Sequence, residues 1–241
     1  MTHSPAPRAR LAASGGAVAL VLVASLLLGM AQSSQAESNL DRSVAAADGP
    51  HAMTARAHPL NARELRLHDQ MRKLWEAHVT WTRLAIVTFA DGSAGFDATA
   101  RRLLRNQVDI GDAFGAFYGK RKGHHLTALL HDHITIAVEI LRAAEAGDDQ
   151  AVADARKRWY ANARDVADFV SSLDRHVWPR KEMRSMMKIH LDQTLAEAVD
   201  ELTGHYHAGV REYGAIERHM LEMADMLSNG LIQQFPGRFR R

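Results

Sequence analysis

Apolar residues recur three and four positions apart through most of this chain, which is the spacing of one face of an α-helix. This periodicity predicts six long helices, at 61–90, 97–117, 124–146, 148–172, 180–203 and 206–232. Short runs of β-branched and aromatic residues, such as 85–89, fall inside a helical period and do not alternate as a strand would. The predicted fold class is therefore all-α.

The helical pattern occurs three times. The histidines at its equivalent points, His78, His133 and His190, are 55 and 57 residues apart, and each is followed 14 positions later by a glycine. Further matching stretches lie at 105–112, 161–168 and 218–225. An internal repeat of this kind indicates one duplicated structural unit.

The duplicated unit is predicted to be an antiparallel helical hairpin. The helical domain at 61–236 then consists of three αα repeats, at 61–119, 120–178 and 179–236. Two packings remain open at this point. The three hairpins form a closed bundle, or a short solenoid in which each pair contacts only its neighbours.

Several residues are predicted to define the helix ends. The pair Asn61 and Glu64 has the spacing of a capping box, in which both side chains satisfy exposed N–H groups. Asp97 and Asp148 are predicted N-caps of second helices. The first helix of each hairpin is expected to end at a glycine in the left-handed conformation, at Gly92, Gly147 and Gly204.

The first 36 residues have the layout of a secretory signal peptide. Arg8 and Arg10 precede an apolar run, and 34–36 offers a small-x-small cleavage site. The alternative is a retained membrane anchor, but the strongly apolar part, 17–30, is short for a hydrocarbon core of about 30 Å. We therefore expect cleavage, a secreted or envelope-exterior location, and no stable membrane span in the mature protein.

Both ends of the helical domain carry polar segments. Residues 37–60 lack periodicity and are predicted to be a flexible tether, and 237–241 a basic tail that is solvated. Loss of Arg8 and Arg10 reduces the 30 basic residues to 28, which equals the 28 acidic ones. A neutral mature chain does not favour binding to nucleic acid. Because the chain has no cysteine, it must be stabilised by a hydrophobic core instead of disulfides.

The repeat histidines are candidate site residues because apolar neighbours share their helix faces. Such imidazoles are expected to be buried or to line a cavity, where each ring nitrogen needs a partner. The second helices offer partners three positions apart: Asn106 with Asp109, Asn162 with Asp165, and His219 with Glu222. A carboxylate bonded to one imidazole nitrogen fixes the tautomer and orients the other nitrogen.

Two interpretations of these residues remain open. In a structural one, repeated His–Asn/Asp contacts only hold the hairpins in register. In the other, a closed bundle brings His78, His133 and His190 together as three ligands for zinc, copper or iron, with an open fourth position. His219 adds a further nitrogen. With Glu222 it resembles, in reverse order, the Glu-x-x-His motif of carboxylate-bridged diiron bundles.

No motif for nucleophilic catalysis or phosphate binding occurs in the sequence, so whether the protein is an enzyme stays open. The stretches 75–83, 104–111, 158–163 and 223–227 resemble a family of small secreted bacterial all-helical proteins without established activity. The resemblance covers nearly all of 65–236. Members of that family are sometimes labelled glycosyltransferases. This sequence does not support that label, because it lacks an alternating strand–helix nucleotide fold and an Asp-x-Asp motif.

The prediction of function is a secreted helical protein that binds a small ligand or a metal through a histidine cluster in or near its core. The metal ligands predicted are His78, His133, His190, His219 and Glu222, supported by Asn106, Asn162, Asp109 and Asp165. The alternative is a non-catalytic structural or interaction module of the cell envelope. The two differ in whether the imidazoles converge on one point or face separate partners.

Overall fold

A computed structural model describes residues 59–240 of the chain. The described elements are α2 (Ala62–Ala90), α3 (Phe96–Tyr118), α4 (Lys120–Ala146), α5 (Asp149–Leu173), α6 (Arg180–Leu202), α7 (Tyr206–Gln234) and the short 3₁₀ helix η1 (Pro236–Arg238). This range contains no strand, so the prediction of an all-α fold is confirmed. The predicted signal peptide at 1–36, and all but the last two residues of the predicted tether, lie outside the described residues.

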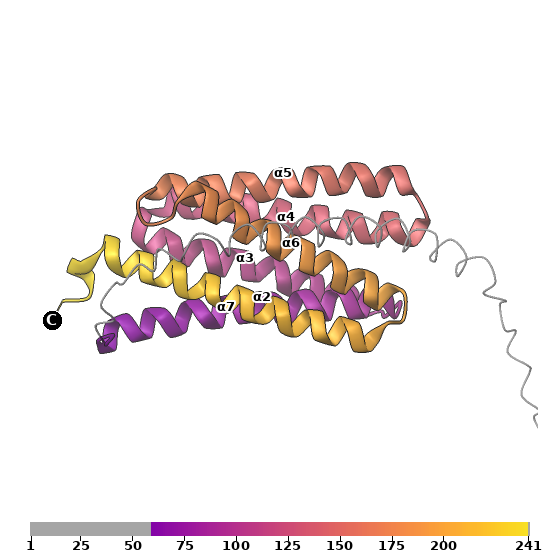
Figure 1. Cartoon of the computed structure of the whole chain (residues 1–241), viewed down its shortest axis with the longest axis horizontal. Coiled ribbons are helices and arrows are strands. Elements are labelled where there is room, and N and C mark those ends of the chain that lie inside the picture. Colours follow the sequence, from indigo (N-terminus) through magenta and orange to yellow (C-terminus); the bar gives the residue numbers. More distant parts are fainter. Residues whose placement is uncertain (1–58, 241) are drawn as a thin grey trace, which may run out of the picture.

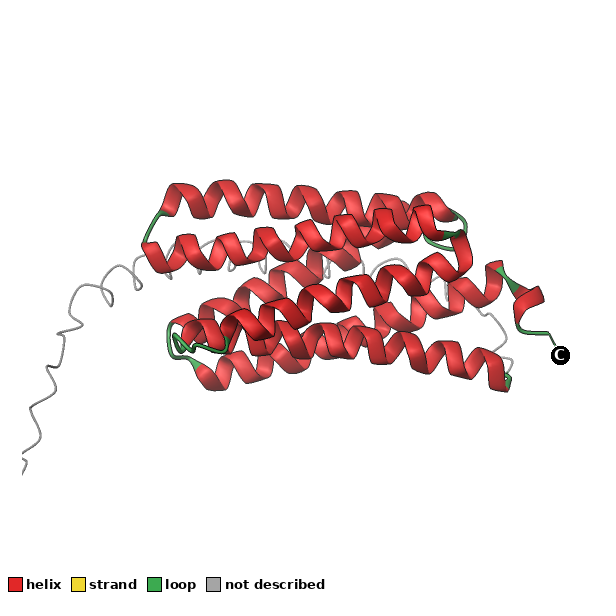
Figure 2. Cartoon of the chain, turned by 180° about the vertical axis from the view of Figure 1, so that it is seen from behind, coloured by secondary structure: helices red, strands yellow, loops and turns green. Residues whose placement is uncertain are grey.

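The helices form a closed ring. Each packs against its neighbours in the chain, and α7 packs against α2, which closes the bundle (Figures 1 and 2). This closure decides against the solenoid. Successive helices alternate in direction, so α2, α4 and α6 run parallel to one another (Figure 1). α2 also packs against α6, across the ring. Within the described residues, no helix is long and apolar enough to cross a bilayer.

The predicted helix ends are largely confirmed. Asn61 Oδ1 accepts hydrogen bonds from the backbone of Arg63 and Glu64, while the Glu64 carboxylate accepts one from the Asn61 backbone N–H. Asp148 caps α5 by accepting from Ala151 N at 2.9 Å. The three glycines that follow the first helices have φ of 60°, 68° and 77°, which is the left-handed region that favours glycine.

Two predicted boundaries were wrong. Asp97 is not the N-cap of α3, because the helix begins at Phe96 and Gly95 occupies the cap position. α4 begins at Lys120, four residues before the predicted start at 124. Gly119, with φ of 88°, alone makes the turn between α3 and α4. A Cβ at Gly123 would lie only 2.6 Å from Gly111 O, so the two helices meet closely there because both positions are glycine.

The hydrophobic core divides into a large cluster and a smaller one. The large cluster contains buried side chains from each of the helices α2 to α7, among them Met71, Phe114 and Leu191. The smaller cluster lies towards the C-terminal ends of α2, α4 and α6 and consists of Ile86, Phe89, Leu141 and Ala198. A cavity has lining residues from both clusters, so it lies where the two meet.

The two ends of the helical domain lie against each other. Asn61 Nδ2 donates to Phe239 O at 3.3 Å, and Arg63 Nη1 donates to Arg240 O at 3.0 Å. The Arg238 guanidinium lies 4.9 Å from the centre of the Phe117 ring. The basic tail is therefore not simply solvated, since its described residues pack on the end of the bundle. Figure 1 shows the C-terminal segment at the same end as the start of α2.

Candidate functional site: a buried histidine cluster

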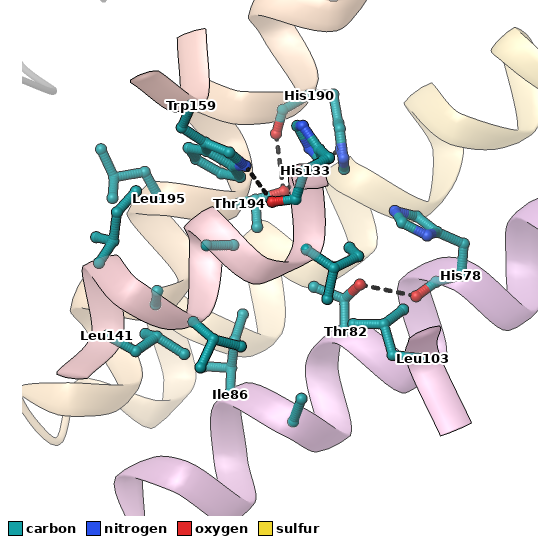
Figure 3. A pocket seen from close by; sticks show the side chains of 16 residues that line it. His78, Thr82, Ile86, Leu103, His133, Leu141, Trp159, His190, Thr194 and Leu195 are labelled. Carbon is teal, nitrogen blue, oxygen red and sulfur yellow. Dashed lines mark hydrogen bonds between the residues drawn. The ribbon is translucent and has the colours of Figure 1, made fainter. Parts of the chain in front are cut away.

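The three repeat histidines converge inside the bundle. His78, His133 and His190 are 3%, 2% and 4% exposed, and they come from the parallel helices α2, α4 and α6. The centre of the His190 ring lies 5.7 Å from that of His78 and 6.2 Å from that of His133. Figure 3 shows the rings of His133 and His190 beside each other, with His78 extending towards them from α2. We call these three residues the histidine cluster.

In each hairpin, an equivalent hydrogen bond joins the two helices. In each case a side chain of the second helix donates to the backbone carbonyl four residues before the repeat histidine. The contacts are Asn106 Nδ2 to Leu74 O (3.0 Å), Asn162 Nδ2 to Leu129 O (3.0 Å) and His219 Nε2 to Met186 O (2.9 Å). His219 thus substitutes for an asparagine as a donor to a carbonyl. It is not a member of the histidine cluster.

The tautomer of His133 follows from its partner. Because Asn162 Nδ2 donates to a carbonyl, the amide oxygen of Asn162 is the atom that lies 2.8 Å from His133 Nδ1. An oxygen can only accept, so His133 Nδ1 carries the proton and His133 Nε2 carries a lone pair. This Nε2 is buried and has no hydrogen-bond partner among residues 59–240. It is a free acceptor, or a free ligand atom, in the interior.

The other two imidazoles have different neighbours. Gln107 Nε2 lies 3.2 Å from His78 Nδ1 and donates to Leu103 O at 2.8 Å. His190 Nδ1 lies 3.4 Å from Thr194 Oγ1. Gln107 is completely buried and has no polar equivalent in the other repeats, where Ala163 and Met220 occupy the position. Sequence reasoning missed it for this reason.

Each histidine of the cluster also has its backbone carbonyl bonded by a side chain. The donors are Thr82 Oγ1 to His78 O (2.8 Å), Trp159 Nε1 to His133 O (3.0 Å) and Thr194 Oγ1 to His190 O (2.8 Å). These bonds are the dashed lines in Figure 3. Both threonine hydroxyls donate their hydrogen to a carbonyl, and the Nδ1 atoms of all three imidazoles lie within 3.4 Å of a neighbouring side chain. In the histidine cluster, His133 Nε2 is the buried imidazole nitrogen that has no hydrogen-bond partner among the described residues and is available to bind a ligand.

The cluster borders a cavity of about 60 Å³. One water molecule needs about 10–15 Å³ by this measure, so the space suits a few waters, an ion with its ligands, or a very small molecule. Apart from the imidazoles and the two threonines, the walls are apolar and include Ile86, Leu141 and Leu195. No carboxylate lines the cavity within the described residues.

Burial keeps the imidazoles neutral. Desolvation lowers the pKa of His78 to about 3, with a smaller contribution from His133 and an opposing effect of the nearby Asn106 side chain. Desolvation lowers the pKa of His133 to about 4, against the hydrogen bond to Asn162. The pKa of His190 also falls well below its usual range, through burial first and then through the neighbouring imidazoles. Neutral imidazole is the form that binds metals.

The predicted carboxylate partners lie elsewhere. Asp165 and Glu222 are exposed, and half-buried Asp109 forms ion pairs with Arg105 and Arg102 on its own helix. The prediction that these carboxylates support or join the histidines is therefore corrected. Residues three apart are about 60° apart around a helix, so when the amide faces inwards the carboxylate lies at the solvent edge.

Within residues 59–240, no three histidine, aspartate or glutamate side chains are placed as a ready metal-ligand set. The ring spacing is nevertheless close to that of bound imidazoles. Two imidazoles on one zinc ion at 2.0–2.1 Å in tetrahedral geometry have centres roughly 5 Å apart. The observed 5.7 and 6.2 Å are longer, and both pairs include His190. The ring contacts of the described residues include none between His78 and His133, so all three rings would have to move towards a shared ion.

Sequence reasoning also missed a group of ion pairs that involves two buried carboxylates. Arg83 of α2 forms ion pairs with Glu197 and Glu201 of α6, at 3.0 and 2.7 Å. The signal was present, because the two glutamates follow His190 by seven and eleven positions and so share its helix face. It was overlooked because it occurs in one repeat only.

No protein-family model, curated protein or solved structure matches this chain.

Proposed function

We propose that this protein binds a transition metal ion through His78, His133 and His190 in the interior of the bundle. The observation that carries the proposal is the buried Nε2 of His133, which is unpartnered among the described residues while Asn162 holds its Nδ1. An imidazole whose far nitrogen is fixed by a hydrogen bond is the usual arrangement of a histidine ligand.

The chemistry of the donors supports zinc, copper or iron. Neutral imidazole nitrogens suit these ions, whereas calcium and magnesium require oxygen ligands, and none of the carboxylates in residues 59–240 lines this cavity. Three histidines would leave one position of a tetrahedral ion open to water or to a small ligand. The cavity volume of about 60 Å³ accommodates such a ligand.

The test is metal binding by the mature chain, purified without a histidine tag. We expect zinc or copper to co-purify. We also expect added zinc at about 100 times its Kd to raise the free energy of unfolding by about 2.7 kcal/mol, or Tm by roughly 5–10 °C. His133→Phe should abolish both effects.

Exposed histidines require a matched control, since surface imidazoles also bind zinc weakly. A variant with His124, His125 and His131 changed to glutamine removes exposed imidazoles and leaves the cluster intact. It should bind and be stabilised like the unchanged protein. If the control loses binding while His133→Phe retains it, the proposed site is wrong.

A structural role is the second candidate. It is favoured by the side-chain-to-carbonyl contact that recurs in all three hairpins, because a duplicated hairpin copies the bonds that hold it together. On this view the imidazoles fill the interior and no metal co-purifies. A protein that is metal-free, and whose Tm zinc and copper leave unchanged, would support it.

We further propose that the chain is exported and acts in the cell envelope or outside the cell, as the sequence of residues 1–36 and the resemblance to secreted helical proteins suggest. N-terminal sequencing of the mature protein tests this. A start near residue 37 is expected, and retention of Arg8 and Arg10 in an intracellular fraction contradicts it.

A further inference from the structure

The guanidinium of Arg83 joins α2 to α6. Arg83 Nη1 lies 3.0 Å from Glu197 Oε1, and Arg83 Nη2 lies 2.7 Å from Glu201 Oε1. The two glutamate side chains are 2% and 4% exposed, whereas the Arg83 side chain is 18% exposed, so two buried carboxylates meet a guanidinium that still reaches solvent. The positions equivalent to Arg83 in the other repeats are Val138 and Leu195. These ion pairs, which we call the Arg83 clamp, are therefore particular to the α2–α6 contact.

The Arg83 clamp and the histidine cluster belong to the same interface. Arg83 follows His78 by five residues on α2, and Glu197 follows His190 by seven on α6. Since α2 and α6 run parallel, both groups lie on the same side of the imidazoles, about 7–10 Å further along the helix axes. Thr194, one turn beyond His190, lines the cavity on the way to Glu197.

A third helix, α7, packs closely against the Arg83 clamp. A Cβ at Gly209 of α7 would collide with Glu201 Oε1 and lie 3.3 Å from Arg83 Nη1. One turn later, the Tyr213 ring lies with its centre 5.9 Å from the Arg83 guanidinium. The Tyr213 hydroxyl is 3.4 Å from Thr80 Oγ1 of α2. The guanidinium thus contacts side chains of two helices, and α2 and α6 cannot separate there without leaving two buried carboxylates without their counter-ion.

We propose that Arg83, held by Glu197 and Glu201, is a positioning residue that sets the separation of His78 and His190 and thereby the affinity of the histidine cluster for a metal ion. The part that concerns affinity rests on the proposed function. The part that concerns the separation of the two imidazoles applies to the metal-free protein and can be tested on its own.

The charges of the clamp predict a pH dependence. One guanidinium faces two carboxylates, and burial raises the pKa of Glu197 to about 7, against the opposing effect of Arg83. When Glu197 takes up a proton, its bond to Arg83 loses its charge-assisted character and weakens. The other charged groups that act on Glu197, or on its acidic neighbours, are Glu201, Asp200, His205, Arg211 and Glu212.

The imidazoles themselves do not titrate in this range. The pKa values of His78 and His133 are about 3 and 4, through burial. Metal affinity in the unchanged protein should therefore rise with pH through an inflection near 7, set by Glu197, and not through one near the usual pKa of histidine. Competition between protons and metal at the ligands alone gives no such inflection.

The experiment measures zinc affinity, and the absorption spectrum of bound cobalt, between pH 5.5 and 8.5. Arg83→Met should lower zinc affinity on the order of tenfold or more, and Arg83→Lys should restore part of it. Glu197→Gln should remove the inflection near pH 7. The matched control is Arg72→Met, which breaks an ion pair between α2 and Asp225 of α7 and leaves α6 untouched. Its affinity and pH profile should be those of the unchanged protein.

NMR of the metal-free protein tests the positioning role of Arg83 independently of metal binding. In Arg83→Met, the imidazole NMR signals of His78 and His190 should shift while those of the Asn162-bonded His133 stay in place. If no variant binds zinc, the proposed function fails and the NMR result alone decides on positioning. If Arg83→Met does not fold, Arg83→Lys and Glu197→Gln give the same comparison. Folded variants with unchanged His78 and His190 signals and unchanged zinc affinity overturn the proposal.

Discussion

Asn162 binds His133 Nδ1 with its amide oxygen and Leu129 O with its amide nitrogen. One side chain of α5 thus joins the two helices of the second hairpin and selects the tautomer of a buried imidazole. Both bonds lie in the interior, where a lost partner leaves a polar group without water to replace it. The consequences of removing Asn162 are therefore specific and measurable.

Asn162→Ala should lower the free energy of unfolding by roughly 2–4 kcal/mol, because it leaves His133 Nδ1 without a partner and removes the extra donor to the Leu129 carbonyl. The His133 ring should also lose its single tautomer, which ¹⁵N NMR of the imidazole detects. Asn229→Ala, at an exposed position of α7, should change stability by less than about 0.5 kcal/mol. Equal effects of the two substitutions would contradict the role of Asn162.

His219→Asn should be tolerated. The equivalent positions are Asn106 and Asn162, and all three side chains donate to the carbonyl four residues before a repeat histidine. An asparagine at 219 can donate the same bond to Met186 O, so we expect a loss of less than about 1.5 kcal/mol and unchanged metal binding. His219→Leu leaves the carbonyl without its extra donor and should cost about 1–3 kcal/mol. Urea unfolding compares the two, and a larger loss in His219→Asn than in His219→Leu would refute the equivalence.

Stability should fall on acidification from pH 6.5. The pKa values of all three cluster histidines are lowered by burial, so below 6.5 the unfolded chain takes up protons that the folded protein does not. Glu197 acts in the opposite direction. Its folded pKa of about 7 lies above its usual value of 4.5, so its contribution to stability is complete below 4.5 and is lost as pH rises to 7.

Between pH 5 and 6, three histidines act against one glutamate, and the net loss should be about 2–3 kcal/mol per pH unit. Glu197→Gln removes the opposing contribution, so its loss on acidification should be steeper. Urea unfolding at pH 5, 5.5, 6, 7 and 8 measures both slopes. A free energy of unfolding that is constant or increases from pH 6.5 to 5 contradicts the burial of neutral imidazoles.

Gly230→Ala should destabilise the protein by about 1–3 kcal/mol. Trp178 is completely buried, and a Cβ at Gly230 would collide with its indole, including Cζ2 at 2.7 Å. Gly214, on the same helix, faces open space apart from Arg218 Nη1 at 3.7 Å. Gly214→Ala should therefore stabilise by up to about 1 kcal/mol through helix propensity. Thermal unfolding of the two variants separates the effect of packing from that of helix propensity. Changes in Tm of the same sign would show that the Trp178 indole is not tightly packed.

The six helices could be predicted from the sequence because periodicity, capping residues and terminal glycines are local signals. Asn61 with Glu64, and Gly147 with Asp148, behave as their neighbours in the chain dictate. Ring closure was not predictable. It depends on α7 meeting α2, residues more than a hundred positions apart, and a duplicated hairpin is equally compatible with an open array.

The site was predicted in part. The repeat indicated that His78, His133 and His190 are equivalent, and closure of the ring then placed them together. Which polar residue of the second helix faces inwards depends on tens of degrees of helix rotation, so the spacing of Asn162 and Asp165 did not distinguish the buried amide from the exposed carboxylate. The Arg83 clamp departs from the repeat, and reasoning based on the repeat could not find it.

The contact between Asn61 and Phe239 has a consequence for the connectivity of the chain. Where the two ends of a closed ring touch, a short linker can join them, and new termini can be placed between hairpins at the exposed positions 119 or 176. Such circular permutants keep every helix–helix neighbour. The order in which the three hairpins are encoded is therefore a property of the gene and not a requirement of the architecture.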